Sequence, residues 1–214
     1  AIEDIEQIIT LTGSDGDPEV AQVLTYILTS LPSTGTISEN SGGMPISNVP
    51  QELSNSTIYF KTAQNDVDQQ SFNFRVEDDG ENDNGGDDQS DEATVTVTIT
   101  PVNDAPTIDL VSDPPPILED AGLQIITLSG ITDGDPEVEQ SITVVATSDN
   151  PSLIPSPLDY DSDSGELSYT PIVEANGEAL ITVTVTDSGG DNNGGDDDTV
   201  ITFTVEVTAV NDEP

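Results

Sequence analysis

The sequence repeats itself, and this repetition limits the chain to a small set of folds. Four phrases of the first half return in the second half in the same order: "IITLTGSDGDPEV" as "IITLSGITDGDPEV", "VEDDG" as "VTDSG", "NDNGGDD" as "DNNGGDD" and "VNDAP" as "VNDEP". Ordered matches of this kind indicate a tandem repeat with a unit of about 110 residues. The sequence therefore predicts two domains, residues 1–102 and 107–214, joined by a linker at residues 103–106.

Within each copy, apolar residues alternate with polar ones. In "ATVTVTIT", residues 93–100, every second residue is apolar and the residues between them are threonines, and residues 181–185 and 201–207 alternate in the same way. Period two with β-branched residues on both faces predicts half-buried antiparallel strands. About seven such strands per copy, separated by Gly, Pro, Asn and Asp turns, predict an all-β chain of two tandem Greek-key β-sandwich domains.

The charge of the chain is extreme and excludes several classes of partner. Asp and Glu number 43 against only two cations, Lys61 and Arg75, so the formal net charge is −41. Such a chain repels nucleic acid and anionic membrane surfaces. It also has no Cys and no His, which removes the thiolate and imidazole ligands of zinc, copper and iron. Any metal must therefore be bound by oxygen.

The sequence predicts neither a membrane span nor an enzyme. No apolar run approaches the roughly 18 residues that a span requires, and no signal peptide is visible, so we expect the chain as given to be soluble. Its start at "AIED" indicates a piece of a longer protein. Without His, Cys or a nucleophile elbow, the paired carboxylates lie in turns rather than in a predicted cleft, and this does not fit glycoside hydrolysis.

The acidic phrases recur at spacings that bring them to the ends of a sandwich. The phrase "VNDAP" at residues 102–106, which contains the linker, is called the joint here. It is followed by Glu119, by the phrase "DGD" at 133–135, and by Asp187 directly after the strand "ITVTVT". Loops of a sandwich gather at its two ends. Asp133, Asp135 and Asp187 could thus share the end that receives the joint, while Glu3 and the phrase "DVD" at 66–68 could face them from the first copy.

These phrases resemble the cadherin family, including the cadherin-like and immunoglobulin-like repeats of large bacterial surface proteins. That family holds calcium between successive repeats with a Glu near the start of one repeat, a D-x-E phrase, a D-x-N-D-N linker, and D-x-D and x-A-x-D phrases of the next repeat. The resemblance implies Ca²⁺ ligands at the following positions: Glu3, Asp66, Asp68, Asn103, Asp104, Asp133, Asp135 and Asp187. Pro101, Ala105 and Asp68 depart from the family pattern, so we expect fewer ions than a full junction of the family holds.

The chemistry of calcium agrees with such a set. Ca²⁺ takes six to eight oxygen ligands from carboxylates, amides and backbone carbonyls at about 2.3–2.6 Å. If the joint is a calcium site, half-sites for neighbouring repeats should remain at both ends of the chain. These are Asp15, Asp17 and Asp78 for a preceding repeat, and Glu119, Asn176, Glu178, Asn211 and Asp212 for a following one.

Two simpler interpretations of the acidic phrases stay open. Asp-Gly, Asp-Pro and Asn-Asp steps form turns, and a charged surface keeps a protein soluble without any ion. The Gly-rich acidic loops at residues 78–92 and 187–198 lack the register of an EF-hand. They are either hairpin tips or a second calcium site.

The sequence favours one function and leaves two others open. The first is a calcium-rigidified module of an extracellular bacterial adhesin, secreted or attached to the cell surface, that serves as a spacer and in cell attachment. The second is a calcium-dependent polysaccharide-binding module of a secreted polysaccharide-degrading system, for which Tyr59, Tyr160 and Tyr169 are the available aromatic residues. The third is homophilic contact, which the family suggests, although this chain has no Trp to anchor an exchanged strand.

Overall fold

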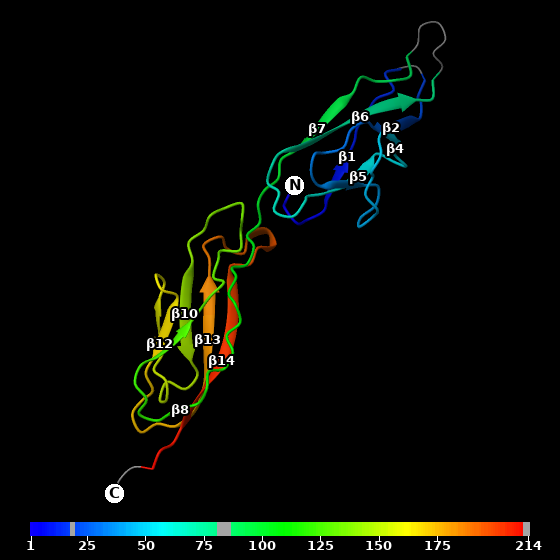
Figure 1. Ribbon diagram of the computed structural model, residues 1–214. Coiled ribbons are helices and arrows are strands. Elements are labelled where there is room, and N and C mark those ends of the chain that lie inside the picture. Colours follow the sequence, from blue (N-terminus) through cyan, green and yellow to red (C-terminus); the bar gives the residue numbers. More distant parts are fainter. Residues whose placement is uncertain (18–19, 81–86, 212–214) are drawn as a thin grey trace. The chain divides into compact units, whose positions relative to one another are not determined.

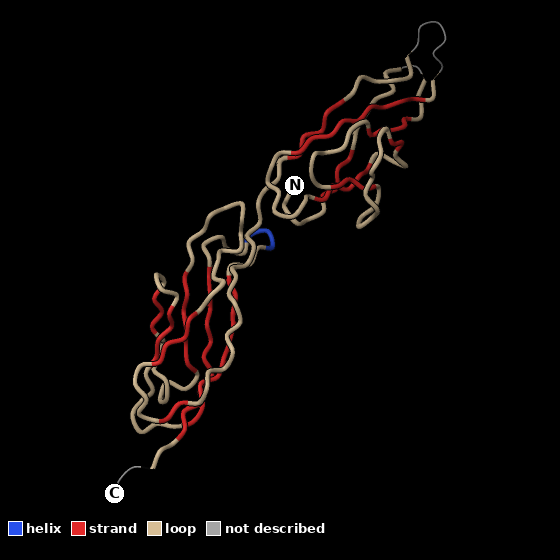
Figure 2. The backbone as a smooth tube through the Cα atoms, in the orientation of Figure 1, coloured by secondary structure: helices blue, strands red, loops and turns tan. Residues whose placement is uncertain are grey.

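A computed structural model describes residues 1–17, 20–80 and 87–211 of the chain. It divides into two compact units, Ala1–Val102 (unit 1) and Asn103–Pro214 (unit 2). Strands supply the regular structure of both, and within the described residues the helical structure is the 3₁₀ turn η2 (Asn192–Gly194) (Figure 2). The predicted all-β class, with two β-sandwich domains, is confirmed. No helix among the described residues is long and apolar enough to cross a membrane.

Unit 1 is built from two sheets (Figure 1). The first has the order β1-β5-β3, with β1 at Gln7–Thr10, β5 at Thr57–Lys61 and β3 at Thr36–Ser38. The second has the order β4-β2-β6-β7, with β4 at Gln51–Glu52, β2 at Leu24–Leu28, β6 at Gln70–Asp78 and β7 at Ala93–Val97. All these strand pairs are antiparallel. In addition, Ile2 forms a parallel bridge with Thr100, which lies three residues after the end of β7.

Unit 2 is also built from a three-stranded and a four-stranded sheet. One sheet has the order β11-β12-β9, with β11 at Asp159–Asp161, β12 at Glu166–Tyr169 and β9 at Gln124–Thr127. The other has the order β10-β13-β14-β8, with β10 at Thr143–Ser148, β13 at Gly177–Thr186, β14 at Asp198–Thr208 and β8 at Ile117–Leu118. The short β8 pairs in parallel with the end of β14, as Ile2 does with Thr100 in unit 1.

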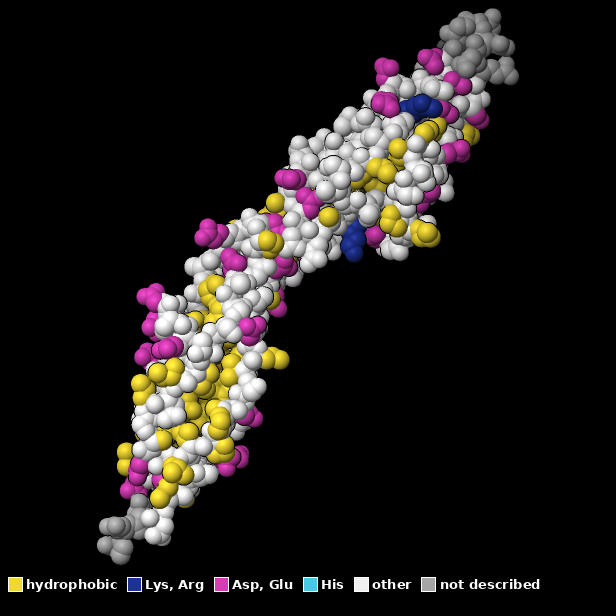
Figure 3. All heavy atoms as spheres, in the orientation of Figure 1, with side chains coloured by type: hydrophobic (Ala, Val, Ile, Leu, Met, Phe, Trp, Pro, Cys, Tyr) yellow, Lys and Arg dark blue, Asp and Glu magenta, His cyan; other side chains and the backbone are white. Residues whose placement is uncertain are grey.

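Alternation along the strands places the core between the two sheets of each unit. On β13, Ile181, Val183 and Val185 are fully buried, whereas the threonines between them are partly exposed. Phe72, Phe74 and Phe203 also lie in these cores and are 1%, 7% and 2% exposed. On the surface, acidic side chains outnumber the two cations (Figure 3), and Arg75 pairs with Glu77 at 2.8 Å.

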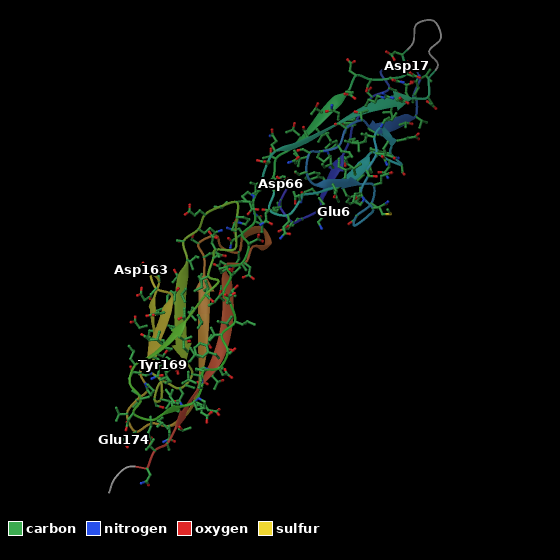
Figure 4. All side chains as sticks on the ribbon, viewed as in Figure 1. Glu6, Asp17, Asp66, Asp163, Tyr169 and Glu174 are labelled. Carbon is green, nitrogen blue, oxygen red and sulfur yellow. The ribbon has the colours of Figure 1, made fainter. Side chains whose placement is uncertain are left out.

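Each unit has two ends, which are named here for their sequences. The DGD end carries the "DGD" turn, at residues 15–17 in unit 1 and 133–135 in unit 2, and the Glu end carries Glu3 or Glu119. Since β13 has ten residues, it separates the two ends of unit 2 by roughly 30 Å. Figure 4 shows Asp17 and Asp66 at opposite ends of unit 1.

Candidate functional site

The DGD turn of unit 2 is held by the side chains of its own aspartates. Asp133 Oδ2 accepts a hydrogen bond from Gln140 N at 2.9 Å, and Asp135 Oδ1 accepts from Glu137 N at 3.0 Å and from Val138 N at 3.1 Å. Such side-chain bonds to the backbone order a loop that belongs to no strand. The carboxyl of Asp135 is thereby fixed and only 5% exposed.

Strand β13 delivers a second buried carboxylate to this end. Asp187 is the first residue behind the strand and is 6% exposed. Its Oδ1 accepts from Gly189 N at 2.8 Å and from Asn103 Nδ2 at 3.0 Å. Its Oδ2 is buried and has no hydrogen-bond partner among the described residues. A buried carboxylate oxygen without a donor is costly, and a cation would remove that cost.

Asn103 connects the acidic side chains. Its Nδ2 donates to Asp187 Oδ1 and, at 2.7 Å, to the Asp196 carbonyl oxygen, while its Oδ1 accepts from Gln140 Nε2. Gln140 Nε2 also donates to Asp135 Oδ2 at 2.9 Å. The structure therefore brings four of the predicted ligands, Asn103, Asp133, Asp135 and Asp187, into one hydrogen-bonded network. The predicted ligand Asp104 follows within the same segment and is half-buried.

The residues predicted as a linker have fixed backbone contacts in unit 2. The Asn103 carbonyl oxygen accepts from Asp196 N at 3.2 Å, and the Pro106 carbonyl oxygen accepts from Thr199 Oγ1 at 2.5 Å. At Gly134, which has φ +79°, any Cβ would collide with the carbonyl oxygen of Ala105. Only glycine allows this close approach, so the joint lies directly against the DGD turn.

The surroundings at this end shift the pKa values of two carboxyl groups in opposite directions. Burial acts to raise the pKa of Asp135, but hydrogen bonds from Glu137, Val138 and Gln140 outweigh it and hold the pKa below the ordinary value of 3.8. At Asp197, partial desolvation and the neighbouring Asp191, Asp198 and Asp187 raise the pKa above 3.8. The hydrogen bonds thus favour the charged form of Asp135, whereas the surroundings of Asp197 oppose its charge.

The raised pKa of Asp197 leads to a prediction about pH. Since the folded pKa lies above the unfolded one, ionised Asp197 destabilises unit 2 at neutral pH, and this penalty disappears below about pH 3.8, where both states are protonated. We expect Asp197→Asn to raise the unfolding temperature in EGTA at pH 7 and to have no effect near pH 3. Calorimetry across this range checks it, and an equal gain at both pH values would contradict it.

At the Glu end of each unit, a buried glutamate accepts a hydrogen bond from the backbone N of the valine that begins that unit's "VND" phrase. Glu3 is 3% exposed, and its Oε2 accepts from Val102 N at 3.2 Å. Glu119 is 7% exposed, its Oε1 accepts from Val210 N at 2.6 Å, and its Oε2 accepts from Asn176 Nδ2 at 3.2 Å. Both carboxylates therefore have a structural role in addition to any binding role.

The other two predicted ligands of unit 1 lie in the turn before β6. Asp66 accepts hydrogen bonds from Thr34 Oγ1, from Gln70 Nε2 at 3.2 Å and from Asp68 N at 3.1 Å, whereas Asp68 is exposed. No hydrogen bond between described residues joins Glu3 to this turn. Nor do any three acidic side chains in the described part of the chain form a cluster that could hold a metal ion by itself.

The predicted half-site at the DGD end of unit 1 is assembled like its counterpart in unit 2. Asp15 Oδ2 accepts from Gln22 N at 3.0 Å, and Asp17 Oδ1 accepts from Val20 N at 3.3 Å. The Gln22 side-chain amide lies 2.9 Å and 3.2 Å from the two carboxylate oxygens of Asp78 and donates to them. At the other end of the chain, Asn211 is exposed and Asp212 lies outside the described residues.

The Gly-rich acidic loop of unit 2 connects the antiparallel strands β13 and β14 and is therefore a hairpin loop. Its backbone also takes part in the network, because Asp187 N donates to the Asp197 carbonyl oxygen at 3.0 Å. The equivalent loop of unit 1 connects β6 and β7, and its residues 81–86 lie outside the described residues.

Sequence reasoning missed the two glutamines. Gln140 and Gln22 each follow the first Asp of the DGD turn by seven residues, in "DGDPEVEQ" and "DGDPEVAQ". The signal was present, because the matched phrases can be extended to these residues. A neutral amide, however, does not stand out among so many carboxylates.

The donor set of this end fits calcium and fits few other metals. It consists entirely of carboxylate, amide and backbone carbonyl oxygens, which are the ligands of hard cations. The side-chain oxygens Asp187 Oδ2 and Gln140 Oε1 are buried and without hydrogen-bond partners among the described residues. The amide groups of Asn103 and Gln140 now lie between the carboxylates and reduce their mutual repulsion.

The tyrosines considered as a sugar-binding platform do not present flat exposed faces. Tyr169 is 6% exposed, and burial raises the pKa of its hydroxyl. Tyr160 packs against the core of unit 2, and Tyr59 is half-buried within β5. The aromatic residues of the described chain therefore serve packing.

Comparison with solved structures shows a cadherin-like fold. Extracellular repeats 22–24 of mouse cadherin-23 match with a TM-score of 0.50 and 16% identity over 94% of this chain, which spans 58% of that chain. Repeats 1–3 of mouse protocadherin-24 match with a TM-score of 0.47 and 17% identity over 86% of this chain and 58% of that one. Repeats 1 and 2 of human mucin-like protocadherin match with a TM-score of 0.41 and 13% identity over 98% and 94% of the two chains. No protein-family model and no curated protein matches the sequence.

Proposed function

We propose that this chain, whose fold is that of cadherin extracellular repeats, is a calcium-binding tandem module of an extracellular bacterial adhesin. Calcium at the DGD end of unit 2 orders the joint, and the ordered pair of units acts as a spacer in cell attachment. The observation that carries the proposal is the buried Oδ2 of Asp187, which has no hydrogen-bond partner among the described residues and belongs to the carboxylate that binds the joint residue Asn103.

The ligand set follows from the sequence and the network. Unit 2 supplies Asn103, Asp104, Asp133, Asp135 and Asp187. The sequence predicts that unit 1 adds Glu3, Asp66 and Asp68. When bound, Ca²⁺ would supply the positive charge that balances these carboxylates. Without the ion, the side-chain amides of Asn103 and Gln140 donate hydrogen bonds to Asp187 and Asp135.

The role of the ion in this proposal is mechanical and not catalytic. Val102 is held by Glu3 in unit 1, and Asn103 is held by Asp187 in unit 2, so two consecutive residues are anchored to different units. An ion that binds ligands from both sides of this peptide bond would restrict motion between the units. A stiff pair of units would keep a binding surface at the far end of the protein at a distance from the cell.

Single-molecule energy transfer between two dyes tests this role. The chain has no Cys, so Met44→Cys in unit 1 and Leu123→Cys in unit 2, at positions 91% and 63% exposed, provide unique labelling sites. We expect CaCl₂ to narrow the distance distribution, MgCl₂ at equal ionic strength to have little effect, and Asp187→Asn to abolish the calcium effect. An unchanged distribution in calcium would exclude the spacer function.

The half-sites at the two ends extend the proposal to neighbouring repeats. Asp15, Asp17 and Asp78 offer the same pattern to a preceding repeat, and Glu119, Asn211 and Asp212 offer theirs to a following one. Calcium would in this way order a longer array with one set of ligands per joint.

A further inference from the structure

Unit 2 has a cavity whose lining includes none of the predicted calcium ligands. It measures about 280 Å³ and lies where β9 begins and β12 ends. Its apolar wall consists of Leu123, Pro155, Pro157 and Leu158. Leu158 belongs to the buried core, whereas Leu123 is 63% exposed and both prolines are exposed. Since ligand pockets measure roughly 300–1,000 Å³, this cavity has the size for a small ligand.

A tyrosine hydroxyl without a hydrogen-bond partner faces this cavity. Tyr169 (Figure 4) lines the cavity and is 6% exposed, because its ring packs in the core of unit 2. No described residue forms a hydrogen bond with its hydroxyl, yet this oxygen is not fully enclosed by protein as Asp187 Oδ2 is. Burial raises the pKa of the hydroxyl, so it stays protonated and able to donate. A largely buried donor without an acceptor is costly, and a ligand oxygen would remove that cost.

Three more polar side chains line the same cavity. They are Asp159, Ser168 and Thr170, and none of their side-chain oxygens has a hydrogen-bond partner among the described residues. Asp159 and Ser168 lie directly opposite each other on β11 and β12, so their side chains are on the same face of the sheet. The cavity therefore combines an apolar wall with hydroxyl and carboxylate groups that are available to a ligand.

The charges of unit 2 decide which class of ligand fits. Lys61 and Arg75 both belong to unit 1, so unit 2 has no cationic side chain. An anionic ligand would meet the Asp159 carboxylate without any compensating cation. A small cation would gain nothing from the apolar wall and is attracted equally by carboxylates elsewhere on the surface. A neutral sugar fits both parts, because its C–H groups pack against Leu and Pro while its hydroxyls bond to Tyr169 and Asp159.

Unit 1 has no such hydroxyl at the equivalent position. Gln124 pairs with Tyr169 across β9 and β12, and Gln7 pairs with Phe60 across β1 and β5. Phe60 is therefore the counterpart of Tyr169, and it is fully buried. The tyrosine hydroxyl in unit 2 is thus an addition that the fold does not require.

The wall of the cavity also differs from the equivalent part of unit 1. Leu123 and Glu6 are counterparts, because each directly precedes the matched strand "QIIT". In unit 1 the Glu6 carboxylate is bound within its own unit, where Oε2 accepts from Ser41 Oγ at 2.6 Å and Oε1 accepts from Gly42 N at 3.0 Å. In unit 2 the same position holds a leucine that is mostly exposed and lines the cavity. A ligand in the cavity would cover this leucine.

We propose that this cavity binds one neutral hexose residue of a glycan. The sugar ring packs against Leu123 and Pro157, one ring oxygen or hydroxyl accepts from the Tyr169 hydroxyl, and another hydroxyl donates to the Asp159 carboxylate. None of the predicted calcium ligands takes part, so the binding does not require an ion. The inference goes beyond the proposed spacer function, because it gives the module a binding surface of its own.

Titration of the isotope-labelled full chain with neutral disaccharides in EGTA tests this site. The probes are cellobiose, maltose, lactose and mannobiose, and glucuronic acid is the anionic control. We expect saturable NMR shifts of the backbone amides of Leu123, Asp159 and Thr170 with at least one disaccharide, and none with glucuronic acid. Shifts that appear only after CaCl₂ is added, or no saturable shift with any disaccharide, would overturn the proposal.

Substitutions separate the hydroxyl from the packing of the ring. Tyr169→Phe introduces the residue that unit 1 has at this position, so we expect the affinity to fall about two- to tenfold without a decrease in unfolding temperature. Leu123→Glu, which also introduces the residue of unit 1, should abolish the shifts, and Tyr59→Phe in unit 1 should leave the affinity unchanged. Unchanged affinity in Tyr169→Phe, or equal shifts with N-acetyl-leucinamide, would reveal a non-specific apolar hollow and would also overturn the proposal.

Discussion

Replacing Gly134 by valine is expected to destabilise unit 2 by about 3 kcal/mol or more. Two costs add at this position. A β-branched residue at φ +79° is strained, and its Cβ collides with the Ala105 carbonyl oxygen, so the joint must leave the DGD turn. Loss of the joint then removes the Asn103 hydrogen bonds to Asp187 and Asp196. Urea unfolding followed by the amide signals of β13 and β14 measures the change in the free energy of unfolding.

Gly16→Val is the matched control for this substitution. Gly16 has nearly the same backbone, φ +71°, but a Cβ there meets no described atom within 4 Å. Valine at Gly16 therefore adds the strain without the collision and should destabilise unit 1 by only about 1–2 kcal/mol. Equal costs in the two units would mean that the joint contributes nothing to unit 2, contrary to the packing described above.

Calcium at one hundred times its dissociation constant is expected to raise the unfolding temperature of unit 2 by roughly 10–20 °C at fixed ionic strength. At a free concentration one hundred times the dissociation constant, binding stabilises a folded domain by about 2.7 kcal/mol. For a domain of this size, 1 kcal/mol corresponds to roughly 4–8 °C. Calorimetry in EGTA and in rising CaCl₂ measures the shift, and MgCl₂ separates binding from general screening of the acidic surface.

Asp187→Asn should remove most of this calcium response. It removes the negative charge of the buried carboxylate, whose Oδ2 has no hydrogen-bond partner among the described residues, and an amide NH₂ placed at that oxygen's position could not bind Ca²⁺. Asp163→Asn is the control, because it removes one carboxylate from an exposed turn between β11 and β12. A rise in unfolding temperature with CaCl₂ that persists in Asp187→Asn would exclude the DGD end of unit 2 as the calcium site. Equal rises with CaCl₂ and MgCl₂ would mean that the aspartates at this end only form turns.

The candidate site was partly visible in the sequence because its parts are local. "DGD" forms its own turn, so Asp133 and Asp135 had to be close to each other. Asp187 could be placed because it follows a strand whose alternation is unambiguous, and strand ends meet at the end of a sandwich. Asn103 could be placed because the joint phrase recurs at the end of the second copy.

Two features of the site could not be found in this way. The central amide of Gln140 contacts Asn103, which is 37 residues away in the sequence, and its type carries no expectation of binding. Asp187 is buried beside Asn103, which donates to it and lies 84 residues away in the sequence. Sequence repeats and hydrophobic periodicity do not predict contacts between residues so far apart in the chain.

The sequence by itself determined the fold class, the two-fold repetition and the acidic character of the chain, because strand periodicity, turn residues and net charge are local or additive properties. The tertiary structure decided which carboxylate oxygen is buried without a donor, which glycines leave room for the joint, and that residues 103–106 pack against unit 2. These properties depend on which atoms meet across long separations in the chain. In unit 1 the same residues meet without a joint between them, and there Gln22 binds Asp78 directly.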